Sequence, residues 1–103
     1  MIDFSKIEGF DWDAGNARKN EKHKVAREEA EQVFVNKPLL LLPDGRHSRS
    51  EARFYALGKT NKARPLHVTF TLRGSDTRIR VISARPMNRK ERSIYETEAN
   101  SEI

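Results

Sequence analysis

The sequence predicts an α+β fold in which an antiparallel β-sheet carries helices packed on it, in the order β-α-α-β-β-β-β-α. In residues 66–72 apolar and polar side chains alternate, the period of two expected of a strand with one buried face. In residues 26–34 apolar side chains instead recur at i, i+4, i+7 and i+8, which is one face of a helix. Hairpin-length connections between the four later strands make that stretch antiparallel.

The elements of the amino-terminal half follow from local signals. Residues 2–12 hold five spaced apolar side chains and predict a short strand or an extended arm. Asp11 or Asp13 then caps a polar surface helix over residues 14–23. The helix of residues 26–34 follows, and a proline shortly after it ends the helical stretch.

The elements of the carboxyl-terminal half are strands until the last helix. Four leucines at residues 39–42 lie between prolines and predict a buried strand, and residues 44–50 form a polar loop. Residues 51–60 form the next strand, with its hairpin turn at 61–64.

Two further signals define the strand and the helix that follow the alternating strand of residues 66–72. Gly74, Ser75 and Asp76 make a turn into a strand over residues 78–84. A capping-box pattern at residues 88–91 then opens a helix that runs to about Ala99.

Composition narrows the class of protein. The length of 103 residues fits one domain over residues 1–103, and the lean 36% of hydrophobic residues suits one layer of helices on one sheet. The chain has no cysteine, no apolar run near the length of a membrane span and no signal-peptide pattern, so we expect a cytoplasmic protein. Scattered histidines and the absence of a Gly-rich phosphate loop predict neither a metal site nor a cofactor.

The charge is unevenly distributed. The chain carries a net +5, yet residues 46–103 alone carry a net +7, and ten of their thirteen basic residues are arginine. Arginine presents a planar fork of donors that matches phosphate oxygens, so this half is a candidate polyanion-binding surface. The alternative is an ordinary solvated charged surface.

Strand alternation gives the basic half a candidate binding face. It places the polar side chains of residues 66–72 opposite the core, with Arg78 and Arg80 beside them. Ile82 and Ala84 share the parity of the two arginines, so this face is mixed rather than wholly basic. The alternative role for the two arginines is pairing with acids on a neighbouring strand.

The last strand and helix add a basic corner. Arg85 ends the strand, and Arg89 and Arg92 lie on the first turns of the helix, so the three are expected to cluster. Tyr95 lies one turn after Arg92 and either takes part in chemistry or packs on the sheet. His47 lies in a loop near Glu51, where it either transfers protons or is merely exposed.

Three motifs over residues 10–95 resemble the BrnT family of toxins in order and spacing. They are FDWD at residues 10–13 with Asn20, His23 and EEAExVF at 28–34; HSxxExRFYALG at 47–58; and RVISAR at 80–85 followed by NRKER at 88–92 and Tyr95. Two positions depart from the pattern, which often has glycine where this chain has Lys24 and an aromatic residue or proline where it has Arg27.

The resemblance implies a RelE-like fold and a ribonuclease toxin that cuts RNA without a metal and arrests growth. It implies a BrnA-type antitoxin as partner, with operator DNA reached only through that antitoxin. Such cleavage uses the 2′-hydroxyl of RNA as nucleophile and needs proton transfer and stabilisation of charge on phosphate. Our candidate catalytic residues are His47, Glu51, Arg80, Arg85 and Tyr95, and our candidate RNA-binding residues are Arg53, Arg78, Arg89 and Arg92.

Further candidates for proton transfer are His23, His67 and, more weakly, Tyr55. Two other functions stay open beside the nuclease. One is a non-catalytic nucleic-acid-binding or regulatory module that uses the same basic half, and the other is an inactive relative that only binds an antitoxin-like partner.

Overall fold

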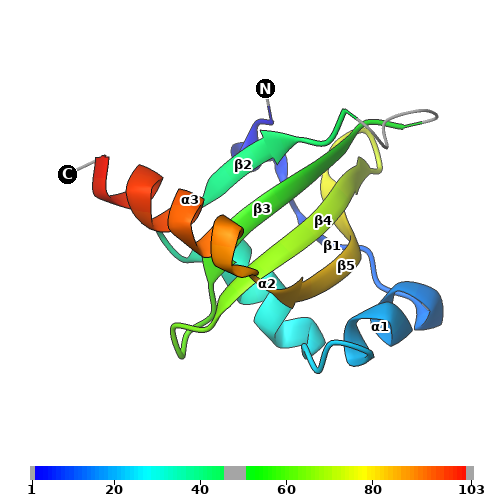
Figure 1. Cartoon of the computed structure of the whole chain (residues 1–103). Helices are drawn as coiled ribbons and strands as arrows, with labels where there is room; N and C mark the ends of the chain where they lie inside the picture. The colour runs from blue at the N-terminus through cyan, green and yellow to red at the C-terminus, as the bar shows by residue number, and fades with distance from the viewer. Residues whose placement is uncertain (1, 46–50, 102–103) are drawn as a thin grey trace.

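The computed structural model describes residues 2–45 and 51–101, and it confirms the predicted α+β class. Figure 1 shows a twisted sheet with α2 behind it, α3 lying across its front, and α1 beside β5. The elements in chain order are the 3-10 helix η1 (Phe4–Lys6), β1 (Gly9–Phe10), α1 (Ala14–Glu21), α2 (Arg27–Val35), β2 (Leu40–Pro43), β3 (Arg53–Lys59), β4 (Pro65–Arg73), β5 (Arg78–Pro86) and α3 (Arg89–Ser101).

The five strands lie in the order β1-β5-β4-β3-β2. Strands β2 to β5 form an antiparallel meander, as the short connections predicted. One pairing differs from the expected antiparallel sheet, because β1 is parallel to β5, with Gly9 opposite Arg78 and Phe10 opposite Ile79. Most of the chain separates these two strands, so no hairpin fixes their relative direction.

The predicted turns and strands of the meander are present with small shifts at their ends. The turn at residues 61–64 is closed by the Thr60 N–H, which donates to the Arg64 carbonyl at 3.0 Å. The turn at residues 74–76 has positive φ at all three positions. Strand β2 is half-buried rather than buried, because it lies at the edge of the sheet. Of the predicted polar loop, residues 46–50 lie outside the described residues.

The segment before α1 is fixed to β5. One oxygen of Asp13 accepts from the backbone N–H groups of Gly15 and Asn16 at 2.9 and 3.1 Å, which confirms the predicted cap. The side chain of Asn16 is buried and donates to the carbonyls of Asp11 and Val81 at 3.0 and 2.9 Å. These bonds hold two acidic residues, Asp11 and Asp13, against the strand that carries Arg80.

Helix α2 closes the main core on the back of the sheet. Ala30 and Val33 are fully buried, and the ring of Phe34 meets that of Phe70 edge-on at 5.0 Å. The predicted apolar face is therefore confirmed, except that Ala26 is the exposed N-cap residue. The core cluster on this side contains Val25, Ala30, Val33, Ala56, Leu66, Val68, Phe70, Ile79, Val81 and Ala84.

Helix α3 packs on the other side of the sheet over a smaller core. The capping box is complete, because Glu91 N–H donates to Asn88 at 2.8 Å and the Asn88 N–H donates to Glu91 at 3.0 Å. Tyr95 is buried in the cluster with Leu57 and Met87. The start of this helix is thus fixed over the sheet, which matters for the position of Glu91.

One turn between α1 and α2 is strained. Lys24 has φ 55°, in the left-handed region that favours glycine, and its carbonyl accepts from Arg64 at 2.9 Å. We expect Lys24→Gly to raise the free energy of unfolding by about 1 kcal/mol, or roughly 4–8 °C in Tm. Thermal unfolding measures this, with Lys22→Gly as control, because Lys22 is exposed and is not among the positive-φ residues. Equal effects of the two changes would contradict this account.

Candidate active site

The front face of the sheet, on the side of α3, carries the polar residues of the three long strands. Ala56, Val68 and Phe70 belong to the core beneath α2, so their neighbours along β3 and β4 lie on the front face. The front-face residues are Arg53, Tyr55 and Leu57 of β3; His67, Thr69, Thr71 and Arg73 of β4; and Arg80, Ile82, Ser83 and Arg85 of β5.

A β-bulge in β5 brings Arg80 and Arg85 onto this same face. The pairing of β4 with β5 shifts by one residue at Ile82, so the alternation of side chains reverses beyond it. Ala84 is therefore fully buried in the main core, and the expectation that it shares the face of Arg80 is wrong. Strict alternation would have placed Arg85 on the core side.

Arg80 is held by the acidic segment before α1. Its guanidinium lies 2.9 Å from a carboxylate oxygen of Asp13 and 3.5 Å from one of Asp11, and the side chain is 21% exposed. The backbone N–H of Asn16 and the guanidinium of Arg80 lower the pKa of Asp13. Pairing with acids is thus observed, although they come from this segment rather than from a neighbouring strand. Arg80 lies opposite Thr71, as the strand pattern predicted.

A hollow of about 290 Å³ opens on the front face between α1 and the strands. Arg73 bonds Glu51 at 3.1 Å, so Arg73, like Arg80, is held in place by an acid. Three of the lining residues are arginines, which makes the hollow suited to a phosphodiester. Its lining is Gly15, Asn16, Glu51, Arg53, Arg73, Arg80 and Ile82.

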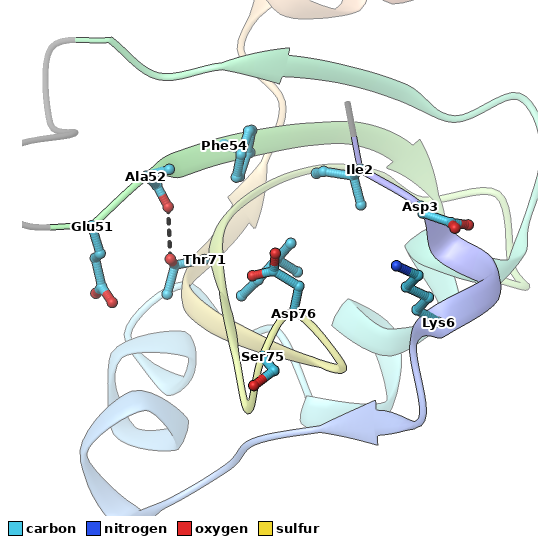
Figure 2. A pocket seen from close by; sticks show the side chains of 10 residues that line it. Ile2, Asp3, Lys6, Glu51, Ala52, Phe54, Thr71, Ser75 and Asp76 are labelled. Carbon is cyan, nitrogen blue, oxygen red and sulfur yellow. Dashed lines mark hydrogen bonds between the residues drawn. The ribbon is translucent and has the colours of Figure 1, made fainter.

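A larger cavity, of about 500 Å³, lies at one end of the sheet and is shown in Figure 2. Among the described residues that line it, Lys6 is the one basic residue, against the carboxylates of Asp3, Glu51 and Asp76. The hydroxyl of Thr71 at its wall already donates to the Ala52 carbonyl at 2.7 Å. A net acidic lining repels RNA phosphates, so we place the candidate site on the front face despite its smaller hollow.

The other end of the front face holds a cluster of four polar side chains. Arg85 makes two parallel hydrogen bonds to the carboxylate of Glu91, at 2.7 and 2.8 Å. His67 Nε2 lies 3.6 Å from the same carboxylate, and its imidazole stacks on the ring of Tyr55 at 4.9 Å. A base, a carboxylate and a guanidinium thus meet where β4, β5 and α3 come together.

Burial, hydrogen bonds and neighbouring charges together set the charge states of this cluster. Burial first, and then the nearby Arg85, lower the pKa of His67 from its ordinary value of 6.5, against the opposite effect of Glu91. Burial raises the pKa of Glu91, but the hydrogen bonds from Arg85 and from the Asn88 N–H outweigh it and lower the pKa overall. At neutral pH the cluster therefore holds a neutral imidazole beside an ionised carboxylate and a guanidinium.

The other predicted residues are placed as follows. The hydroxyl of Tyr95 donates to the Pro38 carbonyl at 2.6 Å and burial raises its pKa, so the structure gives this residue the packing role that the sequence left open. Arg78 is exposed at the start of β5, and Arg89 and Arg92 are exposed on the first turns of α3. His47 lies outside the described residues.

Three residues on or against the front face were not among the predicted site residues. Arg73 ends the alternating strand, and Glu91 was noted only as part of a capping box. His67 was named for proton transfer without a place in the site. The alternation of His67 with Val68 indicates that His67 faces away from the main core. No local pattern indicates that α3 brings a carboxylate to it.

Residues 2–45 and 51–101 hold neither a metal-binding cluster nor a membrane-spanning helix. These residues contain no group of three or more His, Asp or Glu side chains arranged to hold a metal ion. None of the helices within those ranges has the length and apolar character needed to cross a membrane.

The chain matches the model of a known protein family. A family model described as the ribonuclease toxin BrnT of type II toxin–antitoxin systems matches residues 12–91. This range includes both ends of the front face, from the segment before α1 to Glu91. No curated protein matches the chain.

Proposed function

Since the chain belongs to the BrnT family of ribonuclease toxins from type II toxin–antitoxin systems, we propose that it is an endoribonuclease that cuts RNA on its front face. The cut needs no metal ion, inhibits translation and arrests growth. Residues 1–103 act as one toxin domain in the cytoplasm. The observation that carries this proposal is the convergence of Arg53, Arg73 and Arg80 around one hollow of the front face, whose other end holds the Arg85–Glu91 pair.

The arginines supply the electrostatic part of the reaction. Attack of the RNA 2′-hydroxyl on the adjacent phosphorus puts extra negative charge on the phosphate oxygens, and guanidinium donors fixed in position stabilise that charge. Arg80 and Arg85 are partly exposed and already oriented by carboxylates, so little ordering is needed when phosphate arrives. Since the two lie at opposite ends of the face, we assign each of them to a phosphate of the bound RNA, one of which is the scissile phosphate.

Proton transfer has candidates at both ends of the face. Glu51 lines the hollow together with Arg53, and His47 precedes it by four residues in the chain. Tyr95 stays in the original set of candidates, but its hydrogen bond to Pro38 favours packing over chemistry. Exposed Arg78, Arg89 and Arg92 extend the basic surface and are proposed to contact flanking phosphates.

We assign the antitoxin as a BrnA-type protein, and the toxin reaches operator DNA only through it. Inducible expression in a bacterium without the antitoxin tests the whole proposal, with growth and total RNA followed together. We expect growth arrest with RNA breakdown, relieved when the antitoxin is expressed as well. Purified protein is expected to cut RNA in the presence of a chelator.

Normal growth with a folded, intact protein would reject the nuclease. Binding of RNA without cleavage would then favour a nucleic-acid-binding module, and binding of the antitoxin alone would favour an inactive relative. Cleavage that stops when a chelator is added would reject only the metal-independent mechanism.

A further inference from the structure

His67 of strand β4 lies on the front face, but it has no part in the stabilisation of phosphate charge assigned to the arginines. Its side chain is 12% exposed, so it is neither solvated nor part of the apolar core. The imidazole makes a hydrogen bond with the backbone of its own residue, and its Nε2 lies 3.6 Å from the Glu91 oxygen, farther than a hydrogen bond.

The ring of His67 is held in a fixed orientation from three elements. Tyr55 of β3 stacks on one side with an interplanar angle of 18°. Arg85 lies opposite it in the register of β5, and Glu91 is brought over it by the capped start of α3. Among the described residues, Asp44 after β2 adds a further negative charge near the ring.

We propose that His67 is the catalytic base of this ribonuclease and that Glu91 is its positioning residue, an inference that rests on the proposed RNA cleavage. Glu91 lies beside both the residue that stabilises phosphate charge and the residue that takes the proton. Its carboxylate orients Arg85 through two hydrogen bonds and also faces the imidazole of His67. A protonated imidazole beside this carboxylate is stabilised during the reaction.

The reaction step is balanced within the site and water. The 2′-hydroxyl proton passes to Nε2 of His67 while the 2′-oxygen bonds to phosphorus, and the bond from phosphorus to the 5′-oxygen breaks. The 5′-oxygen takes a proton from water, and the hydroxide formed then removes the proton from the imidazolium. The products are a 2′,3′-cyclic phosphate and a 5′-hydroxyl end.

The neutral state of the base is the one that the surroundings favour. Burial and Arg85 lower the pKa of His67, whereas Glu91, a backbone hydrogen bond of the same residue and Asp44 raise it, and the net pKa is below 6.5. The base is thus available at neutral pH and becomes protonated, and inactive, only as the pH falls through that lowered pKa. We expect the acidic limb of the pH–rate profile to lie below pH 6.5.

The test compares cleavage of a fluorescent RNA by the full chain and by four variants. His67→Gln is expected to lower kcat by about 100-fold or more, and added imidazole is expected to restore part of the activity of His67→Ala. Lys62→Gln, at the exposed turn between β3 and β4, is the control and is expected to cut normally. Melting curves check that each variant is folded.

Glu91→Gln tests the positioning role separately. Glutamine keeps the capping box but removes the negative charge beside the imidazole, so the acidic limb of the profile is expected to move to lower pH. A purely structural Glu91 would leave the limb where it is, and that result would overturn its role.

The outcomes separate this inference from the proposed function. Wild-type protein that cuts RNA, together with His67→Gln cutting within about threefold of it, would overturn His67 as base and leave the nuclease intact. A wild-type profile whose acidic limb lies above pH 6.5 would overturn it too, even if the variants fail to fold. Wild-type protein that leaves RNA uncut would overturn the proposed function and this inference together.

Discussion

Replacing Arg85 with alanine is expected to lower kcat/KM for RNA cleavage by about 100–1000-fold, the loss typical of removing one fixed donor to a developing oxyanion. Arg85 combines a side chain that is 35% exposed with two short bonds to Glu91, so it reaches solvent while its orientation is fixed. Arg85→Lys keeps the charge but loses the fork, and we expect it to recover only a minor part of the activity. Initial rates on a defined RNA measure both variants.

Two controls separate chemistry from folding. Arg64→Ala removes an arginine of similar exposure that pairs with Glu29 on the other side of the molecule, and it is expected to cut normally. Arg85→Ala with Glu91→Gln removes the carboxylate left without its partner, so it is expected to regain stability but not activity. If Arg85→Ala cleaves RNA as fast as the Arg64 variant, Arg85 does not belong to the site.

Local signals in the sequence were enough for most of the fold. Asp13 and the pair of Asn88 and Glu91 satisfy backbone N–H groups within three residues of themselves, so the caps are visible in the sequence. The two hairpin turns likewise depend on residues inside them. Such caps and turns can be predicted without knowing which tertiary contacts the chain makes.

The bulge at Ile82 shows where this local reasoning stops. Nothing in residues 78–86 marks the extra residue, because a bulge arises from how β5 pairs with β4. One unpaired residue reverses the face of everything after it, so alternation placed Ala84 wrongly and gave no account of why Arg85 lies with Arg80. The contacts of Arg80 with Asp11 and Asp13 join residues more than 65 positions apart, so no local sequence pattern predicts them either.

The ion pairs between these arginines and carboxylates change how the positive charge of the site acts on RNA. The net charge of +5 attracts RNA at long range, but within the site Arg80, Arg73 and Arg85 each face a carboxylate. Phosphate must therefore share or displace those partners, which limits the strength of ground-state binding. Rigid guanidinium groups contribute most when the phosphate gains charge in the transition state, so the arrangement suits catalysis better than tight binding.

The second large effect is expected at Gly58, the last residue of the central family motif, where Gly58→Ala should destabilise the fold by about 1–3 kcal/mol. A Cβ at this position would lie 2.8 Å from Cγ1 of Val33 and 3.2 Å from its carbonyl oxygen. Val33 is fully buried, so neither its side chain nor the backbone of α2 can move away freely. Denaturant unfolding measures the loss, which exceeds the effect expected at Lys24.

A matched glycine and a double-mutant cycle decide whether this close approach is the cause. Gly9→Ala adds the same methyl group in β1 where no atom lies within 4 Å, so it is expected to change stability little. Val33→Ala removes the nearest side-chain atoms, and the methyl group added by Gly58→Ala then partly fills the space left behind. The double variant is therefore expected to lose less stability than the sum of the two single losses, by about 1 kcal/mol or more. Strict additivity would show that helix α2 does not set the requirement for glycine at this position.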